Sequence, residues 1–233
     1  MPARTRPVAL SVAALLLLTG LAPATVAAAA PDTGGLTLDG EGSALLTAST
    51  ESVAPGLELT SFRRQQPNGW VTGHVMVADL AEPTLSLDLV DSGTVTGGAR
   101  VSEMIDGTGA VAAINGDYFD INASTAPVGT NVSSEGVETI SAESRNTLTV
   151  ADGIAAVAQL TSGATATFAG TTHDVDVVNS PALPAGELGW FTSAWGAYPL
   201  DRPLGGPGTL PDPIARVGVV DGEIVSVTTN PAA

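Results

Sequence analysis

The chain has 233 residues, in which 24 acidic side chains stand against 8 basic ones, all of them arginines, for a formal net charge of −16. This excess of negative charge argues against nucleic acids and anionic lipid surfaces as partners, because both are bound by clusters of lysine and arginine. The chain has no cysteine, which excludes disulfides, thiolate catalysis and cysteine-based zinc sites.

The N-terminal segment has the pattern of a secretory signal peptide. Arg4 and Arg6 precede an apolar run at residues 8–18, and small residues follow at 27–30. The apolar run is short for a helix that must cross a hydrocarbon core of about 30 Å. We therefore expect residues 1–28 to be removed and the mature protein to be secreted or held at the cell surface, with no membrane contact afterwards. The alternative is a retained membrane anchor.

Residues 29–56 are rich in glycine, serine and threonine and are predicted to be a flexible linker, so that one ordered domain covers residues 57–233. Within this domain most apolar residues alternate with polar ones, as they do in strands. The sequence therefore predicts a strand-dominated α+β fold with mixed or antiparallel sheets and few short helices. The predicted elements, in chain order, are strands at 70–80 and 84–90, a helix at 100–105, a small buried strand at 110–114, hairpins at 146–160 and 215–228, and a long loop at 199–213.

One segment combines a predicted strand end with polar side chains. The strand at 110–114 leads into Asn115-Gly-Asp-Tyr-Phe119, which is followed by Asp120. Gly116 permits a close backbone approach to a ligand, and Asn115, Asp117 and Asp120 are expected at the mouth of a sheet. The alternative is an ordinary Asn-Gly turn with solvated acids.

This segment resembles the motif Asn-Gly-Gly-Phe-Phe of the phosphodiester glycosidase family, with Asp117 in place of the second glycine and Tyr118 in place of the first phenylalanine. Four later features occur in the family's order between about residues 57 and 228: Pro127-Val-Gly129, Glu135-Gly136, Arg145 before Asp152-Gly153, and Phe191-Thr-Ser-Ala-Trp-Gly196. The family's glycine-rich C-terminal signature is missing, so the chain is expected to be the N-terminal part of a longer domain.

The resemblance implies an exported glycosidase-type hydrolase that cleaves the sugar C1–oxygen bond of N-acetylglucosamine-1-phosphodiester substrates in surface or extracellular polymers. No cofactor and no metal-ligating residue are assigned, and a requirement for a divalent metal ion stays open. The residues assigned to catalysis are Asn115, Asp117, Asp120 and Arg145. Those assigned to the sugar-phosphodiester or glycan substrate are Gly116, Tyr118, Phe119, Gly129, Thr192 and Trp195.

Several alternatives stay open. Arg145 suits a phosphate anion because a guanidinium binds two oxygens as a fork, but it also suits an ordinary salt bridge. Aromatic rings such as Trp195 and Phe119 offer a flat surface to a sugar, but they also serve as core residues. At the level of function, the alternatives are a non-catalytic carbohydrate-binding or surface module and an inactive fragment of a longer multidomain enzyme.

The signal peptide gives a direct prediction. Protein recovered from the culture medium of a secreting host should begin near Ala29, because basic, apolar and small-residue regions are all present. Mass spectrometry of the intact product measures this. An extracellular product that still starts at Met1 would contradict it.

Overall fold

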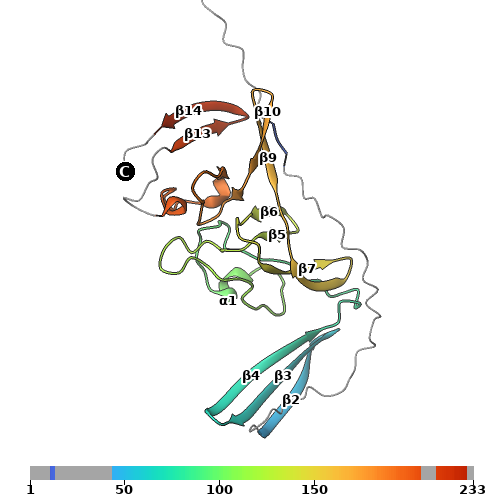
Figure 1. Ribbon diagram of the computed structural model, residues 1–233. Coiled ribbons are helices and arrows are strands. Elements are labelled where there is room, and N and C mark those ends of the chain that lie inside the picture. The colour runs from blue at the N-terminus through green and yellow to red at the C-terminus, as the bar shows by residue number, and fades with distance from the viewer. Residues whose placement is uncertain (1–10, 14–43, 206–213, 230–233) are drawn as a thin grey trace, which may run out of the picture. The chain divides into compact units, whose positions relative to one another are not determined.

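The computed structural model describes residues 11–13, 44–205 and 214–229, and within them the chain is a strand-dominated α+β protein, as predicted (Figure 1). Its contacts divide it into two compact units. The smaller unit contains residues 44–87 and 149–156. The described residues of the larger unit are 11–13, 88–148, 157–205 and 214–229.

The smaller unit is built on an antiparallel sheet of three long strands, β2 (Ala44–Ala54), β3 (Leu57–Gln66) and β4 (Gly69–Ala78), in the order β2-β3-β4. Strand β4 confirms the strand expected at 70–80. The predicted linker is wrong for residues 44–54, which form β2, while residues 29–43 lie outside the described residues. The reason is that threonine and serine, taken as linker residues, also fit a strand that is exposed to water.

Cross-strand pairs hold β3 to β4 on both faces of the sheet. On one face Phe62 lies opposite Gly73, where an added Cβ would come within 2.5 Å of the Phe62 ring. On the other face the Arg63 guanidinium lies 4.5 Å from the centre of the Trp70 ring, a cation–π contact. Such pairs are the unit of stabilisation in a sheet with little burial.

The larger unit consists of short elements. Its helical segments are α1 (Val101–Met104) and the 3-10 turns η1 (Ser193–Trp195) and η2 (Arg202–Leu204). Strand β9 (Ala164–Phe168) pairs with β1 (Ser11–Ala13) on one side and with β10 (Thr171–Val175) on the other. The remaining pairs are β5 (Asn131–Ser133) with β6 (Gly136–Thr139), β11 (Val177–Val178) with β12 (Gly189–Trp190), and β13 (Ala215–Val220) with β14 (Glu223–Thr229). The pair β7 (Asn146–Ala151) and β8 (Ile154–Gln159) has residues in both units.

The two hairpins predicted at Asp-Gly steps are confirmed. Asp152 and Gly153, between β7 and β8, have φ of 52° and 73°, and Asp221 and Gly222, between β13 and β14, have φ of 50° and 78°. A two-residue hairpin turn with both residues at positive φ matches the twist of its strands, and Asp-Gly adopts it readily. The helix expected at 100–105 is also confirmed, as α1.

Two predicted strands are absent from the described structure. Residues 84–90 and 110–114 are irregular, and Leu87, Val111 and Ile114 are exposed. Both segments have the residue pattern of a strand, but neither is paired with a described strand. A strand is stabilised by its neighbours, so pattern alone does not produce one.

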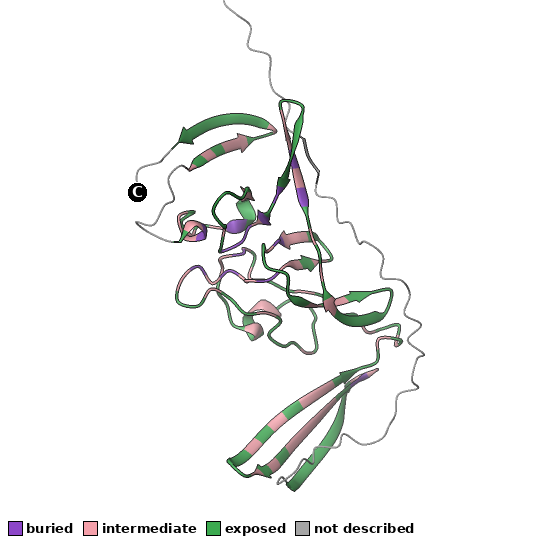
Figure 2. Cartoon of the chain, in the orientation of Figure 1, coloured by how far each residue is buried: buried purple, intermediate pink, exposed green. Residues whose placement is uncertain are grey.

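Two small clusters of buried residues form the core of the larger unit, and most of its other described residues are exposed or only partly buried (Figure 2). One cluster contains Ile140, Ala164, Ala166 and Val175. The other contains Val95, Ala126 and Trp195, with Phe191 and Tyr198 packed against it. The second cluster therefore joins segments far apart in the sequence, next to the predicted site.

The predicted signal peptide falls mostly outside the described residues. Within it the structure describes only β1, which pairs antiparallel with β9. No helix in the described ranges is long and apolar enough to cross a membrane. The signal peptide stays a prediction.

The burial of Trp195 gives a stability test. The Trp195 side chain is 2% exposed, whereas Trp70 is 57% exposed. Trp195→Ala should therefore lower the free energy of unfolding by about 3–5 kcal/mol, as deletion of a core aromatic residue does. The matched control Trp70→Ala should cost much less. Denaturant unfolding followed by circular dichroism measures both, and equal losses would contradict the assignment of Trp195 to the core.

Candidate functional site

The Asn115–Phe119 motif lies in irregular chain, because the expected strand before it is not formed. Asn115 and Gly116 are exposed, and the Tyr118 ring is 79% exposed. The Asn115 side chain donates a hydrogen bond from Nδ2 to the Asp117 carbonyl oxygen at 3.0 Å. The motif therefore presents its polar and aromatic groups to solvent and closes on itself as a turn.

Asp117 connects the motif to the Pro127-Val-Gly129 segment. Its Oδ1 accepts from the Tyr118 backbone N–H at 2.7 Å, and its Oδ2 accepts from the Gly129 N–H at 2.8 Å. A Cβ on residue 129 would lie 2.7 Å from this Oδ2, so the contact requires glycine. Two segments that the sequence analysis assigned to the same site are thus joined by one carboxylate.

Backbone pairing strengthens this junction. Phe119 and Pro127 form an isolated antiparallel bridge, and the Val128 N–H donates to the Tyr118 carbonyl at 3.1 Å. The Gly129 carbonyl in turn accepts from the Thr139 hydroxyl at 2.9 Å, which ties the segment to β6. The two motif segments lie side by side and are anchored to the nearest sheet.

Asp120 is held by a partly buried ion pair that the sequence analysis missed. Its carboxylate accepts from Nε and Nη2 of Arg202, in η2, with Nε at 2.7 Å from Oδ2. It also accepts from the backbone N–H and the hydroxyl of Ser124, at 3.1 and 2.6 Å. The Asp120 side chain is 9% exposed. These contacts, with the Arg202 hydrogen bond as the largest cause, lower the pKa of Asp120 from 3.8 to about 2.

Trp195 and Thr192 are occupied by the protein itself. The Trp195 indole N–H donates to the Tyr198 carbonyl at 2.8 Å, and its ring meets Phe191 edge to face at a centroid distance of 5.3 Å. The Thr192 backbone N–H donates to Oδ1 of the buried Asn179 at 2.9 Å. Trp195 therefore supports the region around Ala126 and Thr192 is bonded to Asn179, and the Trp195 ring offers little surface to a sugar.

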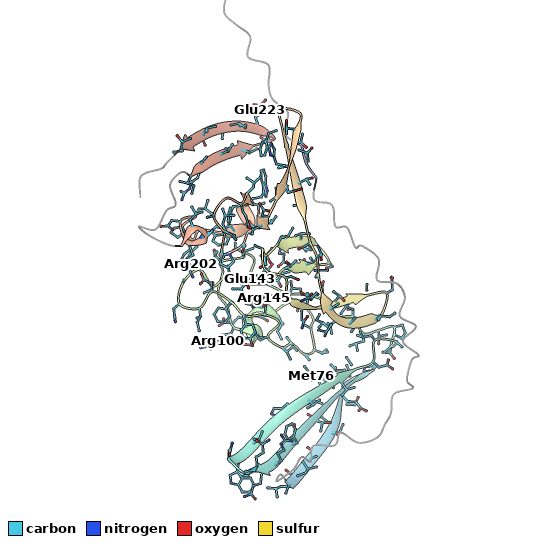
Figure 3. The ribbon with its side chains drawn as sticks, viewed as in Figure 1. Met76, Arg100, Glu143, Arg145, Arg202 and Glu223 are labelled. Atoms are coloured by element: carbon cyan, nitrogen blue, oxygen red, sulfur yellow. The ribbon has the colours of Figure 1, made fainter. Side chains whose placement is uncertain are left out.

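Arg145 is not joined to these residues by any described contact. It pairs with Glu143, and the two side chains are 41% and 71% exposed. Figure 3 shows the two residues beside each other on the irregular chain before β7. The arrangement matches the surface salt bridge that the sequence analysis left open, and such pairs contribute little to stability.

The structure thus brings together only part of the predicted set. The residues joined through hydrogen bonds or packing are Asn115, Asp117, Tyr118, Phe119, Asp120, Gly129 and, through Ala126, Trp195. Thr192 caps η1, three residues before Trp195. Gly116 makes no hydrogen bond of its own among the described residues, and Arg145 stands apart.

A second carboxyl with a shifted pKa, that of Glu138, was also missed. Burial is the largest cause and raises its pKa, and the carboxylates of Asp91, Asp88 and Glu135 add to the effect. Glu138 precedes Thr139 in β6, so their side chains point to opposite faces of the strand. Since Thr139 contacts Gly129, Glu138 faces away from the motif. The described residues contain no group of three or more metal-ligating side chains.

Comparisons with known proteins add no relative: no family model, no curated protein and no solved structure matches the chain. The resemblance to phosphodiester glycosidases therefore rests on the motifs alone.

The Asp120–Arg202 pair predicts a specific dependence of stability on pH. Because the pKa of Asp120 is about 2 in the folded protein and near 3.8 when unfolded, the ionised form stabilises the fold by about 2 kcal/mol above pH 5. This contribution should be lost as the pH falls from 5 towards 2. The difference in unfolding free energy between the wild type and Asp120→Asn should narrow over the same range in denaturant titrations.

The exposed pair Glu143–Arg145 is the matched control. Glu143→Gln should leave the free energy of unfolding nearly unchanged, because water and salt screen that pair. A gap between wild type and Asp120→Asn that stays constant down to pH 2 would contradict the assignment.

Proposed function

We propose that the chain is an exported hydrolase of the phosphodiester glycosidase type, cleaving the sugar C1–oxygen bond of N-acetylglucosamine-1-phosphodiesters in surface or extracellular polymers. The observation that carries this proposal is the Asp117 carboxylate, which joins the Asn115–Phe119 motif to Gly129. Two segments resembling the same family, and separated in the sequence, meet in one loop pair with exposed polar groups.

Cleavage of the C1–oxygen bond requires few catalytic groups from the protein. The phosphate departs with the electron pair of the C1–oxygen bond and leaves an oxocarbenium-like sugar, which a nearby carboxylate stabilises. Water then adds at C1 and gives up one proton to the solvent or to that carboxylate, which completes the hydrolysis. The leaving phosphomonoester has a second pKa of about 6, so it leaves with little protonation. Asp117 serves as the carboxylate next to the sugar, because it lies at the exposed motif, whereas all the acceptor capacity of Asp120 is directed to Ser124 and Arg202.

The exposed side chains of the motif, together with Arg145, provide the proposed contacts with the substrate. The Tyr118 ring is free to stack on a sugar face, with Phe119, 48% exposed, beside it. The Asn115 amide and the open backbone at Gly116 supply hydrogen-bond donors for sugar or phosphate oxygens. Arg145 binds the phosphodiester anion by exchanging its exposed partner Glu143 for two phosphate oxygens, a stronger bidentate contact.

A non-catalytic carbohydrate-binding module is the second candidate. It is favoured by the exposed aromatic pair Tyr118 and Phe119 together with the use of both motif carboxylates in hydrogen bonds within the protein. A module of this kind binds N-acetylglucosamine polymers without releasing sugar.

Kinetics on UDP-N-acetylglucosamine, with release of N-acetylglucosamine as the readout, separates the two candidates. Under the hydrolase proposal Arg145→Ala lowers kcat/KM at least tenfold, about 1.4 kcal/mol, with an unchanged melting temperature. Asp117→Asn lowers kcat by at least about a hundredfold, because the carboxylate charge is lost while the side-chain oxygen still accepts a hydrogen bond.

Arg100→Ala is the matched control, since it removes an equally exposed arginine at the start of α1 and leaves the motif untouched. Its kcat/KM should equal that of the wild type. Binding of the sugar without turnover would favour the carbohydrate-binding module, and equal losses in Arg145→Ala and Arg100→Ala would remove Arg145 from the site.

A further inference from the structure

We propose that Asn115–Gly116 is a site of spontaneous deamidation in the folded protein, while the same dipeptide at Asn68–Gly69 is protected. The chain contains these two Asn-Gly steps and no others. An Asn-Gly step is chemically labile because glycine leaves its backbone nitrogen unhindered for attack on the asparagine side chain. Asparagine is accordingly counted among the thermolabile residues.

The local structure at Asn115 leaves the reacting groups free. Both residues are exposed and belong to no helix or strand. No atom lies within 4 Å of the position that a Cβ on Gly116 would take, and within the described ranges the Gly116 N–H donates no hydrogen bond. One bond restrains the side chain, from Nδ2 to the Asp117 carbonyl oxygen at 3.0 Å. An exposed segment with so few hydrogen bonds changes its backbone conformation at a low cost in free energy.

The second step is held by a hairpin. Asn68 lies in the turn between β3 and β4, and Gly69 is paired with Gln66 as the first residue of a ten-residue ladder. Moving the Gly69 nitrogen towards the Asn68 side chain would break the end of this ladder. The identical dipeptide therefore provides an internal comparison in which exposure is the same and backbone restraint differs.

The reaction needs only water. The Gly116 nitrogen attacks Cγ of Asn115, the Cγ–Nδ2 bond breaks, and the proton lost by the Gly116 nitrogen leaves with Nδ2 as ammonia. The resulting five-membered succinimide then adds one water molecule at either carbonyl and opens to aspartate or isoaspartate. No oxidation or reduction takes place, and one amide is exchanged for one carboxylate.

The product changes the charge of the proposed site. A carboxylate replaces the neutral Asn115 amide, to which the proposed function assigns hydrogen bonds to sugar or phosphate oxygens, so a donor is lost and a second negative charge is added near Asp117. The isoaspartate form also inserts an extra backbone atom before Asp117. The loss of substrate binding rests on the proposed function, whereas the modification itself does not.

Peptide mass spectrometry of the full chain, aged in mildly alkaline buffer at physiological temperature, measures the modification as a gain of about one dalton per site. In the folded protein, deamidation at Asn115 should be at least about fivefold faster than at Asn68, because its segment opens at lower cost. In concentrated urea the two rates should agree within about twofold, since the structural difference is gone.

Gly116→Ala is the matched variant. Its new methyl group meets no neighbour, so the fold is kept, yet it shields the attacking nitrogen and should slow the reaction at residue 115 at least about tenfold. Equal rates at the two sites in the folded protein, or a faster rate at Asn68, would overturn the proposal. Absence of N-acetylglucosamine release from fresh protein would overturn the proposed function alone, because the mass readout needs no activity.

Discussion

The partly buried ion pair between Asp120 and Arg202 is the interaction on which the larger unit depends. It joins positions 82 residues apart, and neither segment has a regular ladder to hold it there. The Asp120 side chain is 9% exposed and the Arg202 side chain 33% exposed, so the carboxylate is the buried partner. Removing Arg202 would leave this carboxylate largely out of water without its partner, which is costly. Next to it, Ser124 and Ala126 are fully buried, and Ala126 packs against Trp195. The position of the 118–128 segment follows from these contacts.

Asp117, in the motif, and Asp120, directly after it, have different structural roles. Asp120 faces inward and fixes the segment, with its pKa lowered by its arginine partner. Asp117, three positions earlier, is bound by backbone N–H groups only, from Tyr118 and Gly129. Backbone donors hold a carboxylate in place without neutralising its charge, so Asp117 keeps a negative charge at the surface. Within this short stretch of chain, Asp120 therefore fixes the backbone and Asp117 leaves a carboxylate near the surface.

Sequence patterns predicted the local features well and the distant ones poorly. The Asp-Gly hairpins and α1 follow from backbone preferences of a few residues, and both are present. The segment 110–114 has the residues of a buried strand, yet strand formation depends on a neighbour that no local pattern specifies. Arg202 lies in a stretch rich in proline and glycine that gave no signal of an ion pair. Trp195 is conspicuous in the sequence, but only packing shows that it supports the site from within.

The Phe62–Gly73 pair has a consequence for how the smaller unit folds. A hairpin whose two faces are both wet has little to prevent one strand from sliding along the other. Here the aromatic ring covers the bare backbone of a glycine, and a slip by one residue would drive it against the side chain of Thr72 or His74 instead. The Phe62–Gly73 pair is compatible with only one register, so it favours the correct alignment of β3 and β4 where no hydrophobic core selects it.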